Sequence, residues 1–451
     1  MSRVRCKLHI ALGLTCLMVL PLPLTADEPA STVVRASHQG QDVQIQLPPA
    51  ELQLPLDDLR KFTEVFGRIK EAYVEEVDDS TLLENAIKGM LSGLDPHSTY
   101  LEPQAYEELE ESTTGEFGGL GIEIGMEDGF VRVITPIDDT PAQRAGVLPG
   151  DMIIKLGDRP VKGMSLEEAV RTMRGEPGTV LRLTIMREGQ AAPLEIDVER
   201  AVIKVTSVRY HTLEPGFGYL RITQFQADTG REFRNAIRNL KQANNDGLQG
   251  LVIDVRNNPG GVLQAAVEAA DALLDEGLIV YTQGRVQSSR LRFSAKPGDV
   301  AEGVPIVVLI NSGSASASEI LAGALQDHKR AVIMGTDSFG KGSVQTVIPL
   351  DETHAIKLTT ARYYTPNGHS IQAKGIEPDI LVKPAQVTEV EGRRMVTEAD
   401  LSRHLSNDDS GRRERDRSSR AEQLSRDFQL TSALNLLKGL SILEQGRTQV
   451  R

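Results

Sequence analysis

The architecture of this chain depends on the stretch VPIVVLINSGSASASEILAGALQDHKRAVIMGTDSFGKGSVQTVIPL, residues 304–350. It begins with an apolar run typical of a buried strand, continues through a serine-rich turn, and then predicts one helix over residues 316–328. The run AVIMGT predicts another strand, after which a lysine stands between two glycines. Strands and helices alternate on both sides of this stretch, from GYLRIT to AIKLTTARYYT, which predicts an α/β domain with a mostly parallel sheet.

The serine-rich turn offers candidate nucleophiles that need a base. The candidates are Ser312, Ser314, Ser316 and Ser318. The nearest histidine, His328, follows Asp327 and suggests a Ser–His–Asp arrangement. Because a helix rises about 1.5 Å per residue, however, the two ends of the predicted helix would lie about 18 Å apart. The base is therefore expected elsewhere.

Lys341, in the sequence FGKGS, is the alternative base. Burial disfavours the ammonium form of a lysine, so a buried Lys341 could take a serine proton as a neutral amine. An exposed loop lysine is the competing interpretation. A phosphate-binding loop is disfavoured, because Gly342 follows the lysine in place of Ser or Thr, and the strand-like SVQTVIPL follows where that loop needs a helix.

The start of the predicted helix offers the second half of a catalytic site. Backbone N–H groups at a helix N-terminus are unpaired and attract anions, so a nucleophile there would lie beside an oxyanion donor. The NNPGG turn, which also follows a predicted strand and opens a helix, could supply a second donor. Ser316 with Glu319 also fits a helix capping box, so a structural role for this serine stays open.

Length and charge limit the function classes. With 451 residues the chain is long enough for two or three domains. Its formal net charge of −13 disfavours nucleic acid as a partner, because binding to phosphates needs a basic face.

The N-terminus predicts an exported protein. A positively charged start and the apolar run HIALGLTCLMVLPLPL lead to Ala26, so residues 1–26 resemble a signal peptide that is cleaved there. A retained, membrane-associated anchor is the alternative. Both cysteines, Cys6 and Cys16, lie in this segment, and the mature chain would hold no disulfide. These features predict a periplasmic protein.

Amphipathic helices are expected near both ends. An apolar stripe predicts a first helix through Leu59, Phe62, Phe66, Ile69 and Tyr73. A second helix is expected to start at Thr81, with Glu84 completing a capping box, and to stop at Gly93. A C-terminal stripe is formed by Leu430, Leu434 and Leu437. Each stripe either packs on its own chain or pairs between subunits.

The part from about residue 115 to residue 200 predicts a compact module rich in strands. Its sequence gives two strands around the turn Asp128-Gly129 and a helix capped by Ser165 with Glu168. The order of elements, the entry GGLGIEI and the signature AGVLPGDMIIKLGD resemble a PDZ domain, which binds extended peptide C-termini by strand addition. The resemblance implies a peptide-binding loop and strand at Gly118, Gly119, Leu120, Gly121 and Ile122. A flexible strand entry is the alternative.

Longer motifs resemble those of the carboxyl-terminal processing proteases, also called tail-specific proteases. They are the stretch 304–350, DVRNNPGG, KLTTARYYTPNGHSIQAKGIEPDI and GMLSGLDPHSTYLEP. The nucleophile of that family is the middle serine of SASAS, a lysine follows 25 residues later, and a glutamine four residues further on orients the lysine. The resemblance therefore implies Ser316, Lys341 and Gln345.

The resemblance also implies a mechanism of acyl transfer. Neutral Lys341 takes the proton of Ser316 as it attacks the scissile carbonyl, and later protonates the leaving amine before water clears the acyl-enzyme. The implied oxyanion donors are the amides of Gly261 and Ala317, with Gly260 as a close competitor to Gly261. Neither a metal nor a cofactor is needed.

We therefore expect a multidomain α/β protein with N-terminal helices, a PDZ-like β-rich module, a crotonase-like α/β protease core and a C-terminal helix. The expected segments are a signal peptide (1–26), a flexible leader (27–54), a helical region (55–113), the PDZ domain (114–202), the protease core (203–383), a charged linker (384–419) and a C-terminal helical segment (420–451).

The expected function is that of a periplasmic serine endopeptidase that recognises protein C-terminal tails and trims or degrades the proteins that carry them. The alternative is a PDZ peptide-binding adaptor with a catalytically silent α/β domain. A third hypothesis is an acyl-CoA enzyme, because the family's core resembles the crotonase fold. The resemblance further implies a homo-oligomer built through terminal helices and, as in some relatives, a lipoprotein adaptor.

Overall fold

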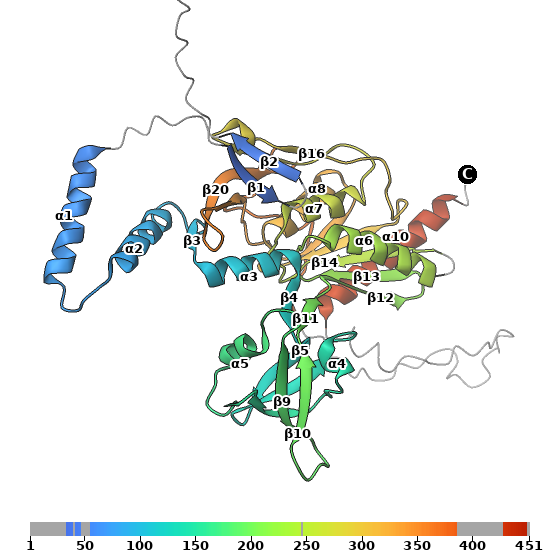
Figure 1. Cartoon of the computed structure of the whole chain (residues 1–451). Helices are drawn as coiled ribbons and strands as arrows, with labels where there is room; N and C mark the ends of the chain where they lie inside the picture. The colour runs from blue at the N-terminus through green and yellow to red at the C-terminus, as the bar shows by residue number, and fades with distance from the viewer. Residues whose placement is uncertain (1–32, 39–40, 47–54, 245–246, 386–426, 449–451) are drawn as a thin grey trace, which may run out of the picture. The chain divides into compact units, whose positions relative to one another are not determined.

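The computed structural model describes residues 33–38, 41–46, 55–244, 247–385 and 427–448 (Figure 1). The predicted signal peptide and charged linker lie outside these residues, apart from residues 384 and 385. The chain forms two compact units, residues 1–69 and residues 70–451, and each is described by itself.

The first unit holds an antiparallel hairpin of β1 (Val33–His38) and β2 (Gln41–Gln46). The leader was expected to be flexible, and the hairpin differs from that expectation because QDVQIQ alternates polar and apolar residues as strands do. Helix α1 (Leu56–Ala72) forms where the apolar stripe predicts it. None of its residues is buried, and Phe62 is 42% exposed.

The second unit opens with α2 (Asp79–Ser92), β3 (Thr99–Leu101) and α3 (Pro103–Thr114). Helix α2 starts two residues before the predicted Thr81, because the carboxylate of Asp78 accepts a hydrogen bond from the Thr81 amide at 2.8 Å and caps the helix from one turn earlier. Gly93 ends the helix as expected.

The β-rich module forms one sheet in the order β10-β9-β7-β6-β5, with β8 paired to β7. Its strands are β5 (Ile122–Glu127), β6 (Phe130–Pro136), β7 (Met152–Leu156), β8 (Arg159–Pro160), β9 (Val180–Met186) and β10 (Leu194–Glu199). Two short helices, α4 (Pro141–Arg144) and α5 (Leu166–Met173), complete it. The predicted Asp128-Gly129 turn has positive φ at both residues, 52° and 79°, and the capping box of α5 is present.

The two ends of this module pair with each other. Strand β4 (Glu116–Gly119) runs antiparallel to β11 (Ala201–Lys204), with Gly119 opposite Ala201. The module is therefore inserted into the chain through a two-stranded stem.

The α/β core, from residue 208 to residue 381, contains a sheet in the order β12-β13-β14-β17-β18-β21. Its strands are β12 (Val208–Glu214), β13 (Phe217–Ile222), β14 (Gly250–Asp254), β17 (Ile306–Ile310), β18 (Val332–Gly335) and β21 (Ile380–Leu381). Only the β12–β13 pair within this sheet is antiparallel, which confirms the predicted mostly parallel sheet.

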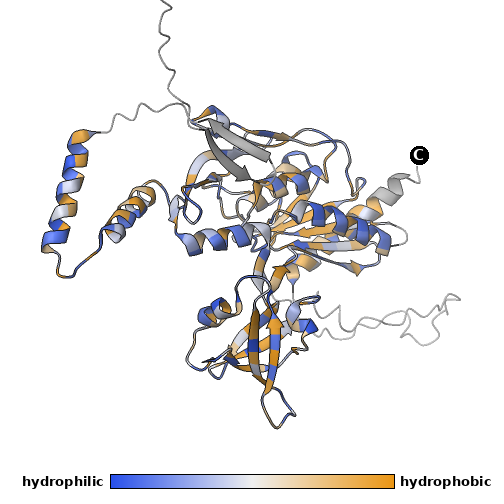
Figure 2. Ribbon diagram, viewed as in Figure 1, coloured by the Kyte–Doolittle hydropathy of each residue, from blue (hydrophilic) through white to orange (hydrophobic). Residues whose placement is uncertain are grey.

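Helices cover both faces of this sheet (Figure 1). The helices α6 (Thr229–Ala243), α7 (Leu263–Asp271) and α8 (Ala317–Asp327) pack on one face against residues such as Leu251 and Ile253. The C-terminal helix α10 (Phe428–Thr448) packs on the other face, where Leu434 and Leu437 are buried against Val252. The C-terminal stripe thus packs on the body of its own chain. In Figure 2 the strands of the core are mainly hydrophobic, whereas α3 is largely hydrophilic.

A second, antiparallel sheet joins β16, β15, β20 and β19 in that order, and the sequence analysis did not foresee it. Its strands are β15 (Leu278–Gly284), β16 (Arg292–Ser294), β19 (Ser343–Pro349) and β20 (Ala355–Tyr364), and the 3₁₀ turn η1 (Gln287–Ser289) lies between β15 and β16. Strand β3 also pairs with β20, which joins the N-terminal region to this sheet.

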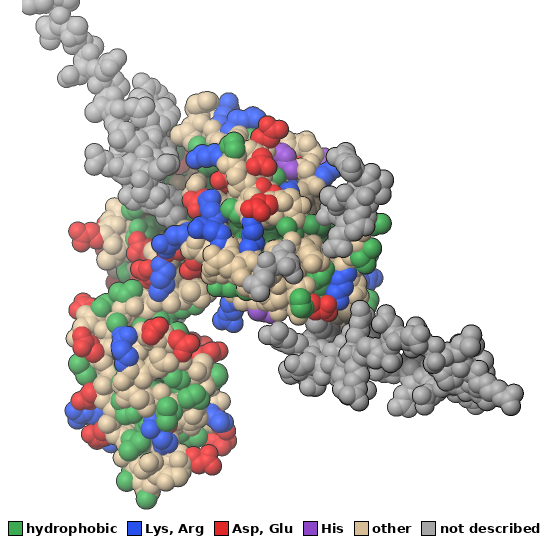
Figure 3. Space-filling model, turned by 90° about the vertical axis from the view of Figure 1, so that its right-hand side faces the viewer, with side chains coloured by type: hydrophobic (Ala, Val, Ile, Leu, Met, Phe, Trp, Pro, Cys, Tyr) green, Lys and Arg blue, Asp and Glu red, His purple; other side chains and the backbone are tan. Residues whose placement is uncertain are grey.

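Within the described residues, no helix has both the length and the apolar character to cross a membrane. Acidic and basic side chains are intermixed on the face shown in Figure 3.

Candidate active site

Ser316 occupies the sharp turn between β17 and α8. The helix begins at Ala317, so this serine is its N-cap, as the predicted helix over residues 316–328 requires. Its backbone has φ 55° and ψ −110°, a region that non-glycine residues rarely adopt and that costs about 1–3 kcal/mol. Ser316 is 8% exposed, so a strained turn holds a nearly buried side chain at the end of a parallel strand.

The neighbouring serines have structural roles. The hydroxyl of Ser314 donates to the carbonyl of Val255 at 2.8 Å, and that of Ser318 donates to the carbonyl of Asn258 at 3.0 Å. Both serines are fully buried. These bonds tie the turn to the end of β14 and leave Ser312, which is exposed, and Ser316 as candidate nucleophiles.

Glu319, one turn into α8, connects Ser316 to the lysine loop. Its side chain is fully buried, and Oε2 accepts hydrogen bonds from the amides of Ser316 at 2.7 Å and Lys341 at 2.9 Å. Its other oxygen accepts from the Ser338 hydroxyl and the Gly340 amide, both at 2.6 Å. The sequence analysis considered Glu319 only as part of a capping box and missed this link, because the loop partners lie about twenty residues further along the chain.

Lys341 lies half-buried at the end of this loop. Burial lowers the pKa of its amine below the ordinary value of 10.5, and the positive charge of Lys357 lowers it further, while the Glu319 carboxylate acts in the opposite direction. Both main effects favour the neutral amine that a general base needs.

Gln345 follows on β19, in the antiparallel sheet. Its side-chain nitrogen donates to the hydroxyl of Ser343 at 2.9 Å and to that of Thr359 at 3.3 Å. None of the hydrogen bonds among the described residues uses its side-chain oxygen, which is therefore available as an acceptor.

The NNPGG turn packs directly on the nucleophile turn. The carbonyl of Asn258 accepts from the amide of Ala315 at 3.0 Å, while its side chain accepts from the amide of Gly260 at 2.9 Å. A Cβ atom on Gly260 would lie 2.8 Å from Cβ of Ser316 and 2.7 Å from the carbonyl oxygen of Ala315, so only glycine fits there.

The hydrogen bonds of the backbone amides at this contact distinguish Gly261 from its competitor Gly260 as an oxyanion donor. The Gly260 amide is already bound to Asn258, whereas those of Gly261 and Ala317 have no acceptor among the described residues. A Cβ atom on Gly260 would be 3.1 Å from the Ala317 nitrogen, so the glycine turn and the start of α8 adjoin each other.

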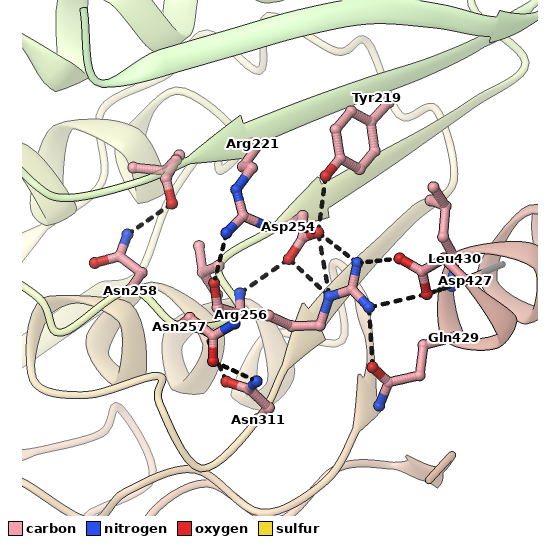
Figure 4. Close-up of polar contacts among 12 residues, drawn as sticks. Tyr219, Arg221, Asp254, Arg256, Asn257, Asn258, Asn311, Asp427, Gln429 and Leu430 are labelled. Carbon is pink, nitrogen blue, oxygen red and sulfur yellow. Dashed lines mark hydrogen bonds and ion pairs between the residues drawn. The ribbon is translucent and has the colours of Figure 1, made fainter. Parts of the chain in front are cut away.

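An ion-pair network anchors the strand that leads to this turn (Figure 4). The carboxylate of Asp254, at the end of β14, is fully buried and accepts from Tyr219 at 2.8 Å and Arg221 at 3.2 Å. Arg256 binds Asp254 and also forms a bidentate pair with Asp427 at the start of α10, at 3.0 and 2.7 Å. The sequence analysis quoted DVRNNPGG without giving these residues a role.

The C-terminal end of α8, where His328 follows Asp327, makes contacts away from Ser316. The Nε2 atom of His328 lies 2.7 Å from the carbonyl of Leu278, and Asp327 accepts from the amide of Asn367 at 2.8 Å. Since both contacts are at the far end of α8 from Ser316, these residues form no triad with it.

Tyr363, on β20, is a buried aromatic residue that interacts with Ser316. Burial raises the pKa of its phenol to about 12, and a hydrogen bond with Ser316 acts in the opposite direction. The sequence analysis gave it no role, although it lies in the motif KLTTARYYTPNG.

The expected peptide-binding residues run from the stem to the edge of the module's sheet, with Gly118 and Gly119 in β4 and Ile122 in β5. Ile122 starts β5, which pairs only with β6 and so has a free edge. The amides of Leu120 and Gly121 have no acceptor among the described residues. Gly118 packs on Gly175, whose carbonyl oxygen would lie 2.4 Å from a Cβ atom at position 118.

The described residues contain no group of three or more His, Cys, Asp and Glu side chains that could hold a metal ion. The groups that the candidate site offers for chemistry are a hydroxyl, an amine, a side-chain amide and free backbone N–H groups.

Comparisons with known proteins agree with this fold and chemistry. Residues 216–382 match the model of peptidase family S41, residues 118–198 match the PDZ domain, and residues 25–105 match the N-terminal domain of the activating protease CtpB. The carboxy-terminal-processing protease of Bartonella bacilliformis is 48% identical over 388 residues, which cover 84% of this chain and 88% of that protein.

A second relative and one solved structure are also similar to this chain. The carboxy-terminal processing protease CtpB of Bacillus subtilis is 37% identical over 80% of this chain and 73% of its own length. Among solved structures, the photosystem II D1 C-terminal processing protease is 31% identical, with a TM-score of 0.44, over 75% of this chain and 89% of that one.

The β-rich module and the α/β core thus define a serine peptidase with a PDZ domain. The chain belongs to the family of carboxy-terminal processing proteases. The hypotheses of a silent adaptor and of an acyl-CoA enzyme are set aside by this membership.

Proposed function

We propose that this protease cleaves polypeptides by acyl transfer, with Ser316 as nucleophile, Lys341 as general base and Gln345 as the residue that orients the lysine. The observation that carries the proposal is the shared carboxylate of Glu319, which binds the amides of Ser316 and Lys341 at 2.7 and 2.9 Å. It holds the two catalytic segments together, while burial favours the neutral amine of Lys341.

In the proposed reaction, the Ser316 oxygen attacks the scissile carbonyl carbon as its proton passes to the Lys341 amine. The amides of Gly261 and Ala317 stabilise the oxyanion, because each is free of other acceptors. The resulting ammonium of Lys341 then protonates the leaving amine, and water, deprotonated by the same lysine, hydrolyses the acyl-enzyme.

We propose that the PDZ domain binds the C-terminal tail of the substrate as an added strand on the free edge of β5. The free amides of Leu120 and Gly121 support this assignment, since a terminal carboxylate needs such donors. Gly118 and Gly119 would bring the loop into place, and Ile122 would begin the receiving strand.

We further propose that the enzyme works in the periplasm, cleaved from its signal peptide at Ala26, and forms a homo-oligomer. The exposed apolar stripe of α1, with Phe62 and Ile69 exposed by 42% and 37%, is the support for assembly through the N-terminal helices. A lipoprotein adaptor for substrate delivery rests on the resemblance to relatives alone.

The decisive test compares the mature chain with Ser316→Ala on a loosely folded protein. We expect cleavage by the parent chain alone, with Ser316→Ala still binding a peptide tail. Cleavage by Ser316→Ala would exclude Ser316 as the nucleophile. In a separate single variant, Gly121→Ala, loss of tail binding would support the proposed carboxylate loop. Light scattering of Phe62→Asp tests the oligomer, and an unchanged mass would rule out assembly through α1.

A further inference from the structure

The turn between α2 and β3 reaches the proposed catalytic glutamine. This turn contains Asp95, within the motif GMLSGLDPHSTYLEP. The carboxylate of Asp95 accepts a hydrogen bond from the hydroxyl of Thr359 at 3.1 Å. The oxygen of that hydroxyl in turn lies 3.3 Å from the side-chain nitrogen of Gln345. A segment more than 200 residues away in sequence therefore contacts the threonine that binds Gln345.

The direction of these hydrogen bonds has a chemical cause. An ionised carboxylate can only accept, so the single proton of Thr359 must point to Asp95. The hydroxyl oxygen of Thr359 can then only accept from Gln345, which must turn its NH₂ group toward Thr359. The side-chain oxygen of Gln345 is thereby fixed on the other side of the amide, free to accept from Lys341.

The turn is built so that Asp95 stays ionised and in place. Burial alone would raise the pKa of Asp95, but hydrogen bonds from the Ser98 hydroxyl, the His97 amide and the Thr359 hydroxyl outweigh it, and the pKa lies below its ordinary value. The Ser98 hydroxyl donates to Asp95 at 2.7 Å and accepts from the Thr359 amide at 3.1 Å, which locks the turn to β20.

The same turn lies near the lysine. Burial, and then the charge of Lys341, lower the pKa of His97, the second residue after Asp95. Strand β3, which follows directly, pairs with β20 so that Thr99 faces Lys357. The turn is therefore held beside the site by main-chain pairing as well as by side chains.

We propose that Asp95 is a positioning residue of the active site, which sets the orientation of the Gln345 amide through Thr359 so that the amide oxygen faces Lys341. The inference rests on the proposed roles of Lys341 and Gln345. Asp95 touches neither substrate nor reacting atoms, and its effect on catalysis passes through Thr359.

Replacement of Asp95 by alanine frees the Thr359 proton to point toward Gln345, and the glutamine amide can then present either of its ends to the lysine. We expect Asp95→Ala to lower kcat by about 10- to 100-fold, the range typical of a misplaced catalytic group, with KM unchanged. Thr359→Val should have a similar effect, and Thr359→Ser should restore kcat because it keeps the hydroxyl.

The matched control is Asp78→Ala. Asp78 also holds a turn of the N-terminal region, by binding Ser80 and Thr81, but has no contact with the catalytic strands. We expect Asp78→Ala to lower thermal stability through loss of a helix cap while kcat stays at the wild-type value. If kcat fell equally in Asp78→Ala and Asp95→Ala, the effect would be structural and the inference wrong.

A double-mutant cycle distinguishes a positioning role of Asp95 from a purely structural role. In a Gln345→Ala background, Asp95→Ala should cause no further loss of kcat, because the residue on which it acts is absent. Additive losses would overturn the inference. The rate at which a fluorophosphonate labels Ser316 should follow the same pattern and requires no peptide substrate.

Different results would overturn the proposed catalytic residues and the proposed role of Asp95. If Ser316→Ala is labelled and active, or Gln345→Ala is as active as the parent, the proposed catalytic residues are wrong and the role of Asp95 is wrong with them. If those variants are impaired while Asp95→Ala and Thr359→Val retain the parent's kcat and labelling rate, only the role of Asp95 is overturned.

Discussion

Ser316 and Lys341 donate their backbone amides to one carboxylate oxygen, Oε2 of Glu319, at 2.7 and 2.9 Å. One fully buried side chain on α8 therefore binds both segments, which a backbone hydrogen bond from the Phe339 amide to the Ser314 carbonyl at 3.0 Å also joins. Such a charge-assisted contact places main chains and leaves the hydroxyl and the amine free for chemistry.

The first prediction concerns Glu319→Gln. A glutamine offers one acceptor where four donors converge, and its NH₂ group would face at least one of them. We expect the free energy of unfolding to fall by about 2–4 kcal/mol and kcat to fall by about 100-fold or more. Urea denaturation and cleavage kinetics measure both, and exposed Glu377→Gln is the control that should change neither. A fully active Glu319→Gln would contradict the bridging role.

The second prediction is a pH dependence. Since a base must be deprotonated, kcat/KM should rise with pH and level off above the pKa of Lys341, which burial and Lys357 hold below 10.5. Lys357→Met removes one of the two causes that lower this pKa. The ascending limb should therefore shift to higher pH in that variant.

A pH–rate profile measures this shift, and Lys374→Met is the control because Lys374 is an exposed loop lysine. A limb that moved to lower pH in Lys357→Met, or that moved equally in both variants, would be inconsistent with this electrostatic origin.

The third prediction tests the contact between the glycine turn and the nucleophile. Gly260→Ala would place a methyl group 2.8 Å from Cβ of Ser316, so one of the two turns must move. We expect kcat to fall by about 100-fold or more, in keeping with a misplacement of about 1 Å. Gly298→Ala is the control, because Gly298 also has an unfavourable positive φ, 138° against 100° at Gly260, but lies in open space; this variant should keep its kcat.

The fourth prediction uses two leucines of α10. Leu437 is fully buried against the core sheet, whereas Leu443 on the same helix is 67% exposed. Leu437→Ala should lower the free energy of unfolding by about 2–5 kcal/mol, and Leu443→Ala by less than about 0.5 kcal/mol. Equal losses, measured in urea, would mean that the exposed end of α10 is covered in solution.

Much of the core could be predicted from local signals. The apolar runs that became β14, β17 and β18 have the length and flanking turns of buried parallel strands, and Ser316 marks the start of α8 as its capping pattern suggests. The PDZ turn at Asp128-Gly129 was equally clear, because two successive positive φ angles favour that pair.

What the sequence did not predict depends on contacts between distant residues. The partners of Glu319 lie in a loop that only the fold brings to it, and no spacing rule links Asp95 to Thr359. The antiparallel sheet was missed for the same reason, because SVQTVIPL and AIKLTTARYYT identify strands but not their pairing with each other or that of β20 with the distant β3. Gly261 is favoured over Gly260 as an oxyanion donor because the Asn258 side chain accepts a hydrogen bond from the Gly260 amide, a contact that the sequence does not predict.

The pairing of β3 with β20 also shapes how the molecule is made. Residues 99–101 leave the ribosome more than 250 positions before their partners at 355–357, and the whole PDZ domain is synthesised in between. Contacts of such large sequence separation form slowly, since closing the chain must precede any gain from them. The PDZ domain, with local contacts and its own stem, can fold during synthesis, whereas the catalytic half assembles only after nearly the full chain exists. A nascent chain that has not yet reached residues 355–357 therefore leaves β3 without its partner strand.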